Sequence, residues 1–556
     1  MTTRHATPLL ALVVLAATAA PASATTFCVP SFHAGCPDNG TNVAQASFET
    51  AITTNASDGI ADRVLVGPLT VTDPDTIEPG GTDPLEIVGS GPADTILTSS
   101  DNGNQFVLNL EPRGPVTVRD LRITVPASFP DGLGSAAQVE HATVENVDVE
   151  VRNPGSDGIS FVGGGSFRDG EIYGSAGGSV ADGIRTNAAI AGPLSIERTT
   201  IVSPAWGVHV EGPGVPVTLD RVTITDPVAY GVSVGGGKAT IRDSLVTSDT
   251  GYAFSVRSAP NAVGSITARN VTLIGIGAVP NAAIEARVLN TVGHKDVTVK
   301  VSDAIIRGFP NSVNRTAPAN GVGVGDAFIT FDHTIVKASG TDTGDGSVTY
   351  GSGVSDVDPL FVDAAAGDHR LQPGSPAIDS ADPGIAPAGQ PVDLAGAPRQ
   401  VDGDGDGQAG RDKGAYEYQP PAAPLGPGPA GGGPAGGGPS APAGPATGPG
   451  PAGTVADTTA PVLSGIRVLR PFTARKGGRV RLTLSEPARV TLTFTAVDRR
   501  AKPRTVRRTF SAKRGRNTLK IRARALKARG YRLRAVAVDR AGNRSKAITR
   551  RLTVKR

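Results

Sequence analysis

The stretch Val118-Arg119-Asp120-Leu121-Arg122-Ile123 decides the fold of this chain, because its pattern returns eight more times along the sequence. Each copy places one polar residue between two short runs that contain alternating apolar residues. These central residues are 22 to 33 positions apart: Asp120, Asn146, Asp169, Arg198, Arg221, Asp243, Asn270, Asp303 and His333. Alternating apolar residues predict short strands, and a short polar residue between two strands predicts a tight turn.

A second pattern runs in phase with the first, and its central positions are 22 to 25 residues apart. Its copies are Asp157-Gly158-Ile159, Asp182-Gly183-Ile184, Trp206-Gly207-Val208, Tyr230-Gly231-Val232 and Tyr252-Ala253-Phe254. Paired strand patterns without helical periodicity predict a β-solenoid, in which successive coils stack and share one core. A β-propeller is the alternative, but its blades need about 40 residues each.

These repeats resemble the right-handed parallel β-helix of the pectin-lyase-like superfamily, from Val64 to Ala338. The resemblance implies an all-β chain with the β-helix over residues 63–338. Open solenoid ends expose unpaired backbone and apolar surface, so a cap is expected at residues 25–62. Apolar spacing predicts that this cap contains a short amphipathic helix over residues 43–52.

The segment 339–418 carries four sequence blocks in a fixed order. They are Asp358-Pro359-Leu360-Phe361-Val362-Asp363 with Gly367–Leu371, then Gly374–Asp379, Ala397–Arg399 and Asp412–Tyr418. This order resembles the ending of secreted β-helix proteins named choice-of-anchor Q. Lys413 departs from the resemblance, since that family usually has an apolar residue there. The family describes exported, often surface-attached proteins and names no reaction.

Residues 1–24 are typical of a secretory signal peptide. An apolar run from Leu9 to Ala20 precedes small residues, and cleavage is expected between Ala24 and Thr25. The protein is therefore expected to be secreted or displayed on the cell surface. Outside the cell, Cys28 and Cys36 are expected to form a disulfide. A lipid-modified Cys28 and a metal site with His33 are the alternatives.

The formal net charge of +3 conceals two oppositely charged parts. Residues 1–456 sum to −23, whereas residues 457–556 hold 30 Lys and Arg against 4 Asp and Glu. A Pro/Gly/Ala linker over 419–456 joins the two parts. The basic part resembles immunoglobulin-like or fibronectin-type-III-like β-sandwiches. Its charge predicts binding to a polyanion, such as an anionic envelope polymer or an acidic polysaccharide, and nucleic acid is a second polyanion that it would attract.

Alternating carboxylates on a glycine-rich loop suggest a Ca²⁺ site. Asp402, Asp404 and Asp406 match the opening of an EF-hand-type loop, although Lys413 replaces the Glu at the twelfth position. Asp412 is expected to substitute as a ligand. A solvated acidic turn is the alternative.

Two candidate groups lie on the repeats themselves. Asp157 and Asp182, one coil apart, are candidate catalytic carboxylates, with Arg185 and His209 beside them. Repeated carboxylates of this kind also occur as solvated turns. Trp206, Tyr230 and Tyr252 form an aromatic ladder that could hold sugar rings. Strand alternation instead places these rings at a corner of the core, because they share parity with inward Val208 and Val232.

The sequence thus favours an exported, non-catalytic β-helix scaffold that interacts with carbohydrate or cell-wall polymers. Its basic C-terminal domain would hold it to the envelope. The alternative is a polysaccharide lyase or glycoside hydrolase that uses Asp157, Asp182, Arg185 or His209.

Overall fold

The computed structural model describes most of the chain from residue 24 to residue 555, and it forms two compact units, Met1–Pro421 and Ala422–Arg556. Residues 1–23, which include all but the last residue of the expected signal peptide, lie outside the described residues. So do residues 421–462, which include most of the expected linker. The remaining gaps are 55–59, 73, 75, 78, 80, 101–104, 112–113, 128–133, 175–179, 187–191, 213–215, 278–280, 320–322, 385–390, 476, 485–487, 497–504, 514, 522–525, 528–529, 539–544, 546–547 and 556. Among the described helices, none is long and apolar enough to cross a membrane.

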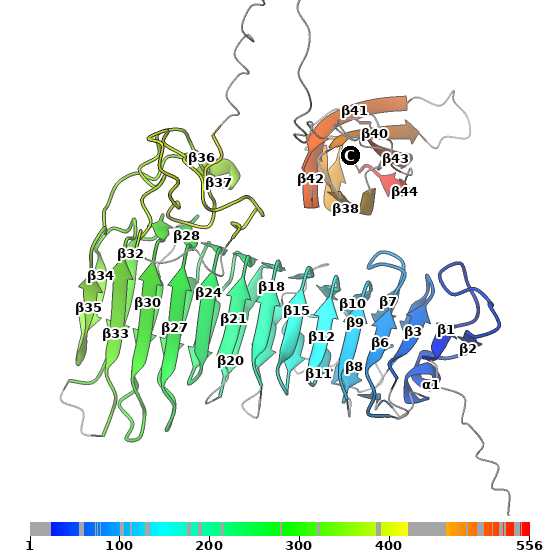
Figure 1. Ribbon diagram of the computed structural model, residues 1–556, viewed down its shortest axis with the longest axis horizontal. Coiled ribbons are helices and arrows are strands. Elements are labelled where there is room, and N and C mark those ends of the chain that lie inside the picture. The colour runs from blue at the N-terminus through cyan, green and yellow to red at the C-terminus, as the bar shows by residue number, and fades with distance from the viewer. Residues whose placement is uncertain are drawn as a thin grey trace, which may run out of the picture. The chain divides into compact units, whose positions relative to one another are not determined.

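The first unit is a parallel β-solenoid, which confirms the predicted fold class (Figure 1). Within the described residues, its coils build three parallel sheets of 14, 10 and 11 strands, called sheets 1, 2 and 3 here. Sheet 1 contains β1 (Thr26–Val29), β2 (Val43–Ala44), β3 (Asp62–Val66), β6 (Leu85–Val88), β9 (Val116–Arg119), β12 (Ala142–Glu145), β15 (Gly165–Arg168), β18 (Leu194–Glu197), β21 (Pro216–Asp220), β24 (Lys238–Arg242), β27 (Gly264–Arg269), β30 (Val297–Ser302), β33 (Ala327–Asp332) and β35 (Gly346–Tyr350).

Sheets 2 and 3 complete each coil. Sheet 2 contains β4 (Thr70–Thr72), β7 (Ile96–Thr98), β10 (Arg122–Val125), β13 (Asp148–Val151), β16 (Glu171–Gly174), β19 (Thr200–Val202), β22 (Thr223–Thr225), β25 (Leu245–Ser248), β28 (Thr272–Gly275) and β31 (Ile305–Arg307). Sheet 3 contains β5 (Thr76–Ile77), β8 (Phe106–Leu110), β11 (Ser135–Val139), β14 (Asp157–Phe161), β17 (Val180–Thr186), β20 (Pro204–Glu211), β23 (Tyr230–Gly235), β26 (Tyr252–Arg257), β29 (Ala282–Arg287), β32 (Asn311–Thr316) and β34 (Gly340–Thr343).

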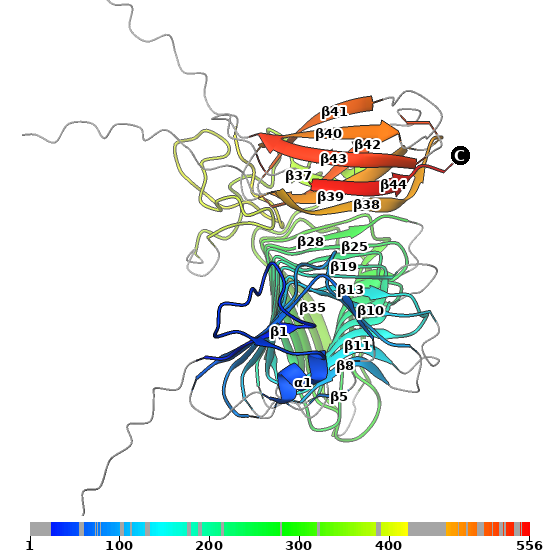
Figure 2. The same cartoon turned by 90° about the vertical axis from the view of Figure 1, so that its right-hand side faces the viewer.

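One continuous hydrophobic core runs through the coils, enclosed by the three sheets (Figure 2). Equivalent apolar residues lie in register on successive coils, as with Val144 and Phe167 in sheet 1 and Val149 and Ile172 in sheet 2. All four are at most 2% exposed. Because a strand alternates its side chains between two faces, the same strands present polar residues outward.

The nine repeat centres all adopt the left-handed backbone conformation, with φ between 42° and 60°. Eight of them connect a strand of sheet 1 to a strand of sheet 2, as Asp120 connects β9 to β10, whereas His333 follows β33 and the next strand is β34 of sheet 3. Asp and Asn enter this conformation more readily than other residues that carry a Cβ atom. The predicted turn is therefore a one-residue corner, and Arg198 and Arg221 adopt it without that advantage.

The N-terminal end of the solenoid is capped (Figure 2). The Cys28–Cys36 disulfide is present, which confirms that prediction. Helix α1 (Phe48–Thr53) starts after Ser47, whose side chain accepts a hydrogen bond from the Thr50 N–H, and it buries Phe48, Ala51 and Ile52. The expected helix over 43–52 is displaced, because residues 43–44 at its start form the edge strand β2, which pairs with β1.

The coils continue past Ala338 through β34 and β35, and the chain then folds back over sheet 2. We call residues 356–418 the cover segment; it contains β36 (Phe361–Asp363), η1 (Ala364–Ala366) and β37 (Asp368–Leu371). Its Leu371 and Ile378 pack against Ile305 and Ile335, and Ala415 packs against Leu245 and Ile274. Figure 1 shows this segment in yellow-green beside β28. The four sequence blocks thus build a layer over the coils.

The second unit is an antiparallel β-sandwich. One sheet contains β38 (Leu463–Thr473), β39 (Gly477–Leu484) and β42 (Gly515–Ile521); the other contains β40 (Ala488–Ala496), β41 (Thr505–Ala512), β43 (Gly530–Val538) and β44 (Ile548–Thr553). Side chains from both sheets, including Val480, Leu482, Val490 and Leu492, share one buried cluster.

Candidate functional site

A polar row follows the outer face of sheet 3 across seven coils. Its members are in register with one another: Ser160, Arg185, His209, Ser233, Ser255, Glu285 and Asn314. Inward neighbours such as Val208, Val210, Val232 and Val234 are fully buried. The row therefore stands on the face of the strands opposite to the core.

A second line of side chains, the corner column, runs beside the polar row. It consists of Asp157, Asp182, Trp206, Tyr230 and Tyr252, at the first positions of the repeated Asp-Gly-Ile pattern. Trp206 is in register with Asp182 on one side and with Tyr230 on the other. The Asp182 N–H donates a hydrogen bond to Asp157 Oδ1 at 3.0 Å, so the two residues are adjacent on neighbouring coils.

The corner column points outward, which corrects the expected placement of the aromatic ladder in the core. The glycine that follows each member occupies the inward position: a Cβ atom on Gly207 would lie 2.8 Å from Ile224 Cγ2. Val208 is also fully buried, so two successive residues face the core and the strand alternation shifts by one. Trp206 is therefore on the same side as His209, and their ring centroids are 3.8 Å apart.

Four candidate catalytic residues meet in one cluster on this face. His209 Nδ1 is 3.1 Å from Asp182 Oδ2, and Arg185 has atoms 4.0 Å from Asp157 and 3.8 Å from Asp182. Sequence reasoning missed a fifth member, Glu211, which accepts a 2.8 Å hydrogen bond from Arg185 and lies 3.4 Å from His209 Nε2. Glu211 lies two residues after His209 on the same strand. Side chains at this spacing share one face of a strand, so the spacing could have identified Glu211 from the sequence.

The electrostatics of this cluster distinguish Asp157 from its neighbours. Burial and then the nearby Asp182 charge raise the pKa of Asp157 to about 6, despite the Asp182 N–H and the Arg185 charge, which lower it. A carboxyl that titrates near neutrality can donate or accept a proton under ordinary conditions. The arrangement can therefore bind hydroxyl groups through charged partners and can exchange a proton at Asp157.

The aromatic members extend the cluster along the solenoid. The Trp206 and Tyr230 rings meet edge to face with centroids 5.6 Å apart, and the Tyr230 and Tyr252 rings stack at 5.7 Å. The Arg257 guanidinium lies 4.6 Å from the Tyr230 ring centroid. Trp206 and Tyr252 remain partly exposed, whereas Tyr230 is 9% exposed.

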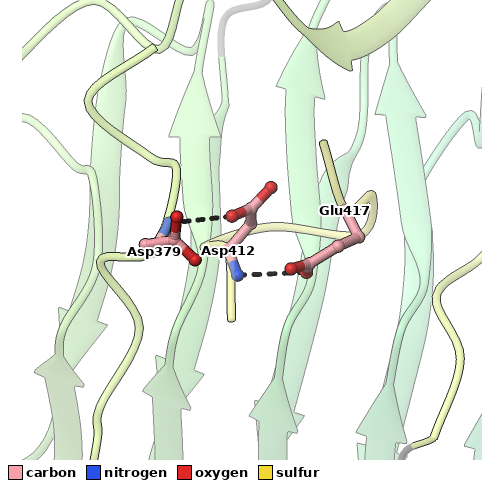
Figure 3. A group of neighbouring side chains, drawn as sticks. All are labelled: Asp379, Asp412 and Glu417. Carbon is pink, nitrogen blue, oxygen red and sulfur yellow. Dashed lines mark hydrogen bonds between the residues drawn. The ribbon is translucent and has the colours of Figure 1, made fainter. Parts of the chain in front are cut away.

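The structure does not bring the four predicted Ca²⁺ ligands together in one group. Asp402 and Asp404 form one carboxylate group with Asp379, and Asp412 forms another with Asp379 and Glu417, each with ligand atoms within 4.8 Å of one another (Figure 3). Asp406 belongs to neither group and accepts a hydrogen bond from the Gln408 N–H. Sequence reasoning missed Asp379 and Glu417 as candidate ligands, although each lies in one of the four sequence blocks of the cover segment.

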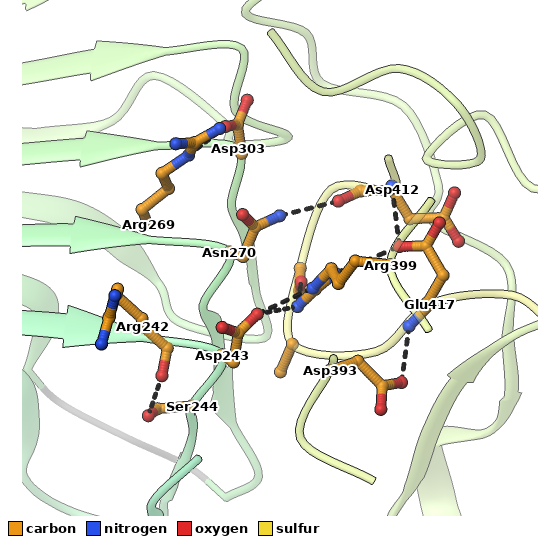
Figure 4. A network of polar contacts seen from close by, with 12 residues as sticks. Arg242, Asp243, Ser244, Arg269, Asn270, Asp303, Asp393, Arg399, Asp412 and Glu417 are labelled. Carbon is orange, nitrogen blue, oxygen red and sulfur yellow. Dashed lines mark hydrogen bonds and ion pairs between the residues drawn. The ribbon is translucent and has the colours of Figure 1, made fainter. Parts of the chain in front are cut away.

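The cover segment is held to the solenoid by a buried polar network (Figure 4). Arg399, 1% exposed, donates to Asp243 Oδ1 at 2.7 Å through Nε and to Glu417 Oε2 at 3.3 Å through NH1. Asn270 donates to the Asp412 carbonyl, and the Gly414 N–H donates to the Asp303 carbonyl. Three corner residues of the solenoid therefore bind the segment that covers them.

Two carboxyls of this network are strongly perturbed. Burial, followed by the Asp412 charge, raises the pKa of Glu417 to about 9, although Arg399 lowers it. Burial also raises the pKa of Asp412 to about 7, against hydrogen bonds from the Tyr418 and Asp379 N–H groups. The protein partners therefore do not offset the cost of burying both groups as carboxylates, and both carboxyls hold their protons more tightly than exposed ones do.

Comparison with known proteins places few constraints on this chain. No protein-family model matches it, and neither does any curated protein. Among solved structures, it is similar to a mannuronic acid-specific polysaccharide family 6 lyase enzyme from human gut microbiota. The identity is 10%, 57% of this chain and 88% of that chain are covered, and the TM-score is 0.27. Functional proposals for this chain therefore depend on its own residues.

Proposed function

We propose that this protein is an exported β-helix scaffold that binds carbohydrate along the outer face of sheet 3. The observation that carries the proposal is the corner column beside the polar row. Carboxylates, a guanidinium, an imidazole and three aromatic rings occupy adjacent coils on one face. Adjacent strands are about 4.8 Å apart, so a polymer lying along the solenoid axis would meet a new pair of side chains at each coil.

The side-chain chemistry of this face suits sugars. Aromatic rings offer flat apolar surface, and Tyr carries a polar group at its edge. Arg185, Glu211 and Asp182 supply charged hydrogen-bond partners, which form stronger bonds than neutral ones. A sugar ring combines apolar C–H faces with hydroxyls around its edge, so it can use both kinds of contact.

The proposal includes export of the protein and its attachment to the cell envelope. The N-terminal sequence, the disulfide and the resemblance of the cover segment to choice-of-anchor Q proteins all support an extracellular location. Ca²⁺ enters as a structural ion of the cover segment, away from the carbohydrate face.

The basic domain would hold the protein to an anionic envelope polymer. Arg489, Arg532 and Arg534 are exposed and alternate with buried Val490 and Leu533, which places them on the outer face of the four-stranded sheet. Residues 457–556 hold 30 Lys and Arg against 4 Asp and Glu. Such a face attracts a polyanion.

A polysaccharide lyase or glycoside hydrolase is the second candidate function. It is favoured by the raised pKa of Asp157 and by the contact of Asp182 with His209, since proton transfer near neutral pH requires a group that titrates there. The carbohydrate would occupy the same face in both cases.

A polysaccharide screen of the secreted protein tests the proposal and separates the two candidates. Binding is expected to at least one neutral or acidic polysaccharide, with Trp206→Ala weakening it about tenfold or more. Tyr350→Ala is the matched control, because Tyr350 is a partly exposed aromatic on sheet 1. Equal loss in both variants, or no binding, contradicts the proposal. Release of products that Asp182→Asn abolishes would favour the enzyme over the scaffold.

A further inference from the structure

The cover segment contains a convergence of carboxylates at Asp379, Asp412 and Glu417. Candidate ligand atoms from all three lie within 4.8 Å of one another (Figure 3). Asp412 is 1% exposed and the Glu417 side chain is 1% exposed, so two of the three are removed from water. Bringing three acidic groups together in this way is unfavourable unless a cation or protons balance them.

One atom of this group has no partner. Glu417 Oε2 accepts hydrogen bonds from the Asp412 N–H and from Arg399, but Glu417 Oε1 is buried and accepts none. A buried carboxylate oxygen without a partner is unfavourable, and native structures normally pair such atoms or place an ion or water beside them. In Figure 4 the Glu417 carboxylate lies beside that of Asp412.

The other two carboxylates are oriented by the backbone and still have free lone pairs. Asp412 Oδ1 accepts one bond from the Asp379 N–H, and Asp379 Oδ1 accepts one from the Gly410 N–H. A carboxylate oxygen has two lone pairs, so each atom can also coordinate a cation. These N–H contacts fix the carboxylates before any ion arrives.

An access route reaches Asp379, whereas Asp412 and Glu417 are not among the residues that line it. A cavity of about 170 Å³ is lined by Asp379, Asp382, Gln400 and Arg411, among others. Asp379 also joins Asp402 and Asp404 in the adjoining carboxylate group. The second group lies nearer the surface, since Asp404 is exposed.

We propose that Asp379, Asp412 and Glu417 bind a Ca²⁺ ion that fastens the cover segment over the last coils of the solenoid. Ca²⁺ takes oxygen ligands in flexible geometry, and its remaining positions would be filled by water or by backbone carbonyls. The ion neutralises the carboxylates next to the Arg399 network and gives Glu417 Oε1 a partner. The proposal of this Ca²⁺ site does not depend on carbohydrate binding by sheet 3.

The test uses the full secreted chain, stripped with a chelator and titrated with Ca²⁺ alone. Calorimetry is expected to show binding, accompanied by a higher Tm. Tb³⁺ should give luminescence on tyrosine excitation, because Tyr418 adjoins the site through its N–H contact with Asp412, and Ca²⁺ should displace it. Glu417→Gln is expected to weaken binding about tenfold or more, since affinity follows the charge of the ligands.

Asp406→Asn is the matched control. Asp406 belongs to the loop that the EF-hand-like pattern selects, yet it lies in neither carboxylate group, so this variant should bind Ca²⁺ like the unaltered chain. Asp379→Asn, which keeps an oxygen for the Gly410 N–H, serves if Glu417→Gln fails to fold. Absence of Ca²⁺ binding by the unaltered chain, or loss on Asp406→Asn with retention on Asp379→Asn or Glu417→Gln, overturns the proposal.

Discussion

At the scale of single residues, the corners of the solenoid show what a repeat can predict. The repeat pattern predicts nine central turn residues, and all nine have positive φ. Asp and Asn at six of them are consistent with a turn. Arg198 has a compensating contact, because its guanidinium makes two 2.7 Å hydrogen bonds to Asp169 on the preceding coil. Among the described residues, the Arg221 side chain has only a 3.4 Å contact with Asp220, so its strained backbone is poorly compensated.

Arg221→Asn is therefore expected to stabilise the solenoid by about 0.5–1 kcal/mol, since left-handed backbone costs an ordinary residue about 1–2 kcal/mol. Chemical denaturation of both proteins measures the difference in free energy of unfolding. Arg168→Asn is the control, because Arg168 lies in strand β15 without positive φ, and there Asn should be neutral or destabilising. Stabilisation by both changes, or by neither, would show that backbone strain is not the cause.

The pKa of Asp157 makes a second prediction at this scale. Its folded value of about 6 lies above the ordinary 3.8, so the folded chain holds the proton more tightly than the unfolded chain. This carboxyl therefore destabilises the fold increasingly as pH rises from 3.8 to 6, by up to about 3 kcal/mol. Asp157→Asn should raise Tm at pH 8 and change it little at pH 4. The same Tm difference at both pH values would contradict this origin.

At the scale of elements, the order of the strands was predictable and the direction of the corner column was not. Alternation along a strand predicts which residues face the core, and it holds for Ile184 and Val208. It fails for Trp206, because Gly207 takes an inward position that a larger residue could not occupy. A period-two pattern contains no information about such a shift. The identity of the glycine was visible in the sequence, but its contact with Ile224 was not.

Gly207→Ala is expected to destabilise the solenoid. A Cβ atom there would lie 2.4 Å from the Gly231 carbonyl oxygen of the next coil and 2.8 Å from Ile224 Cγ2. Crowding of this kind in a packed core costs about 1–3 kcal/mol. Gly235→Ala is the matched control in the neighbouring strand β23, because its nearest contact would be 3.9 Å away. Similar loss of Tm in the two variants would rule out the close approach between coils as the cause.

The cover segment marks the limit of sequence reasoning at the element scale. Its four blocks are recognisable, but their partners are far away along the chain, as Arg399 and Asp243 are 156 residues apart. The alternating Asp402, Asp404 and Asp406 suggest a local loop of ligands, whereas the structure groups Asp412 with Glu417 and Asp379. Only the folding of the segment across sheet 2 brings these blocks together. Spacing along the sequence therefore identified Asp412 but missed Asp379 and Glu417.

At the scale of the whole molecule, charge is divided between the two units. Residues 1–456 carry −23 and residues 457–556 carry +26, so any anionic polymer would be attracted by one part and repelled by the other. The Debye length is about 8 Å at physiological ionic strength, so only contacts at the basic surface itself would survive there. Attachment through the second unit should therefore be strong at low salt and should depend steeply on salt.

Binding of the full chain to immobilised heparin, used as a model polyanion, tests this division of charge. Simultaneous Arg507→Gln, Arg532→Gln and Arg534→Gln should weaken binding at low salt by about tenfold or more, since each charge lost reduces electrostatic attraction. The difference should shrink toward zero in 1 M salt, where the Debye length is about 3 Å. Lys295, Lys300 and Lys337 are exposed on the solenoid. Changing all three to Gln removes the same amount of positive charge, so this variant controls for the net charge of the whole protein. If both triple variants weaken binding equally, net charge and not the sandwich face governs attachment. Salt-independent binding would remove the electrostatic basis for holding the protein to an anionic envelope.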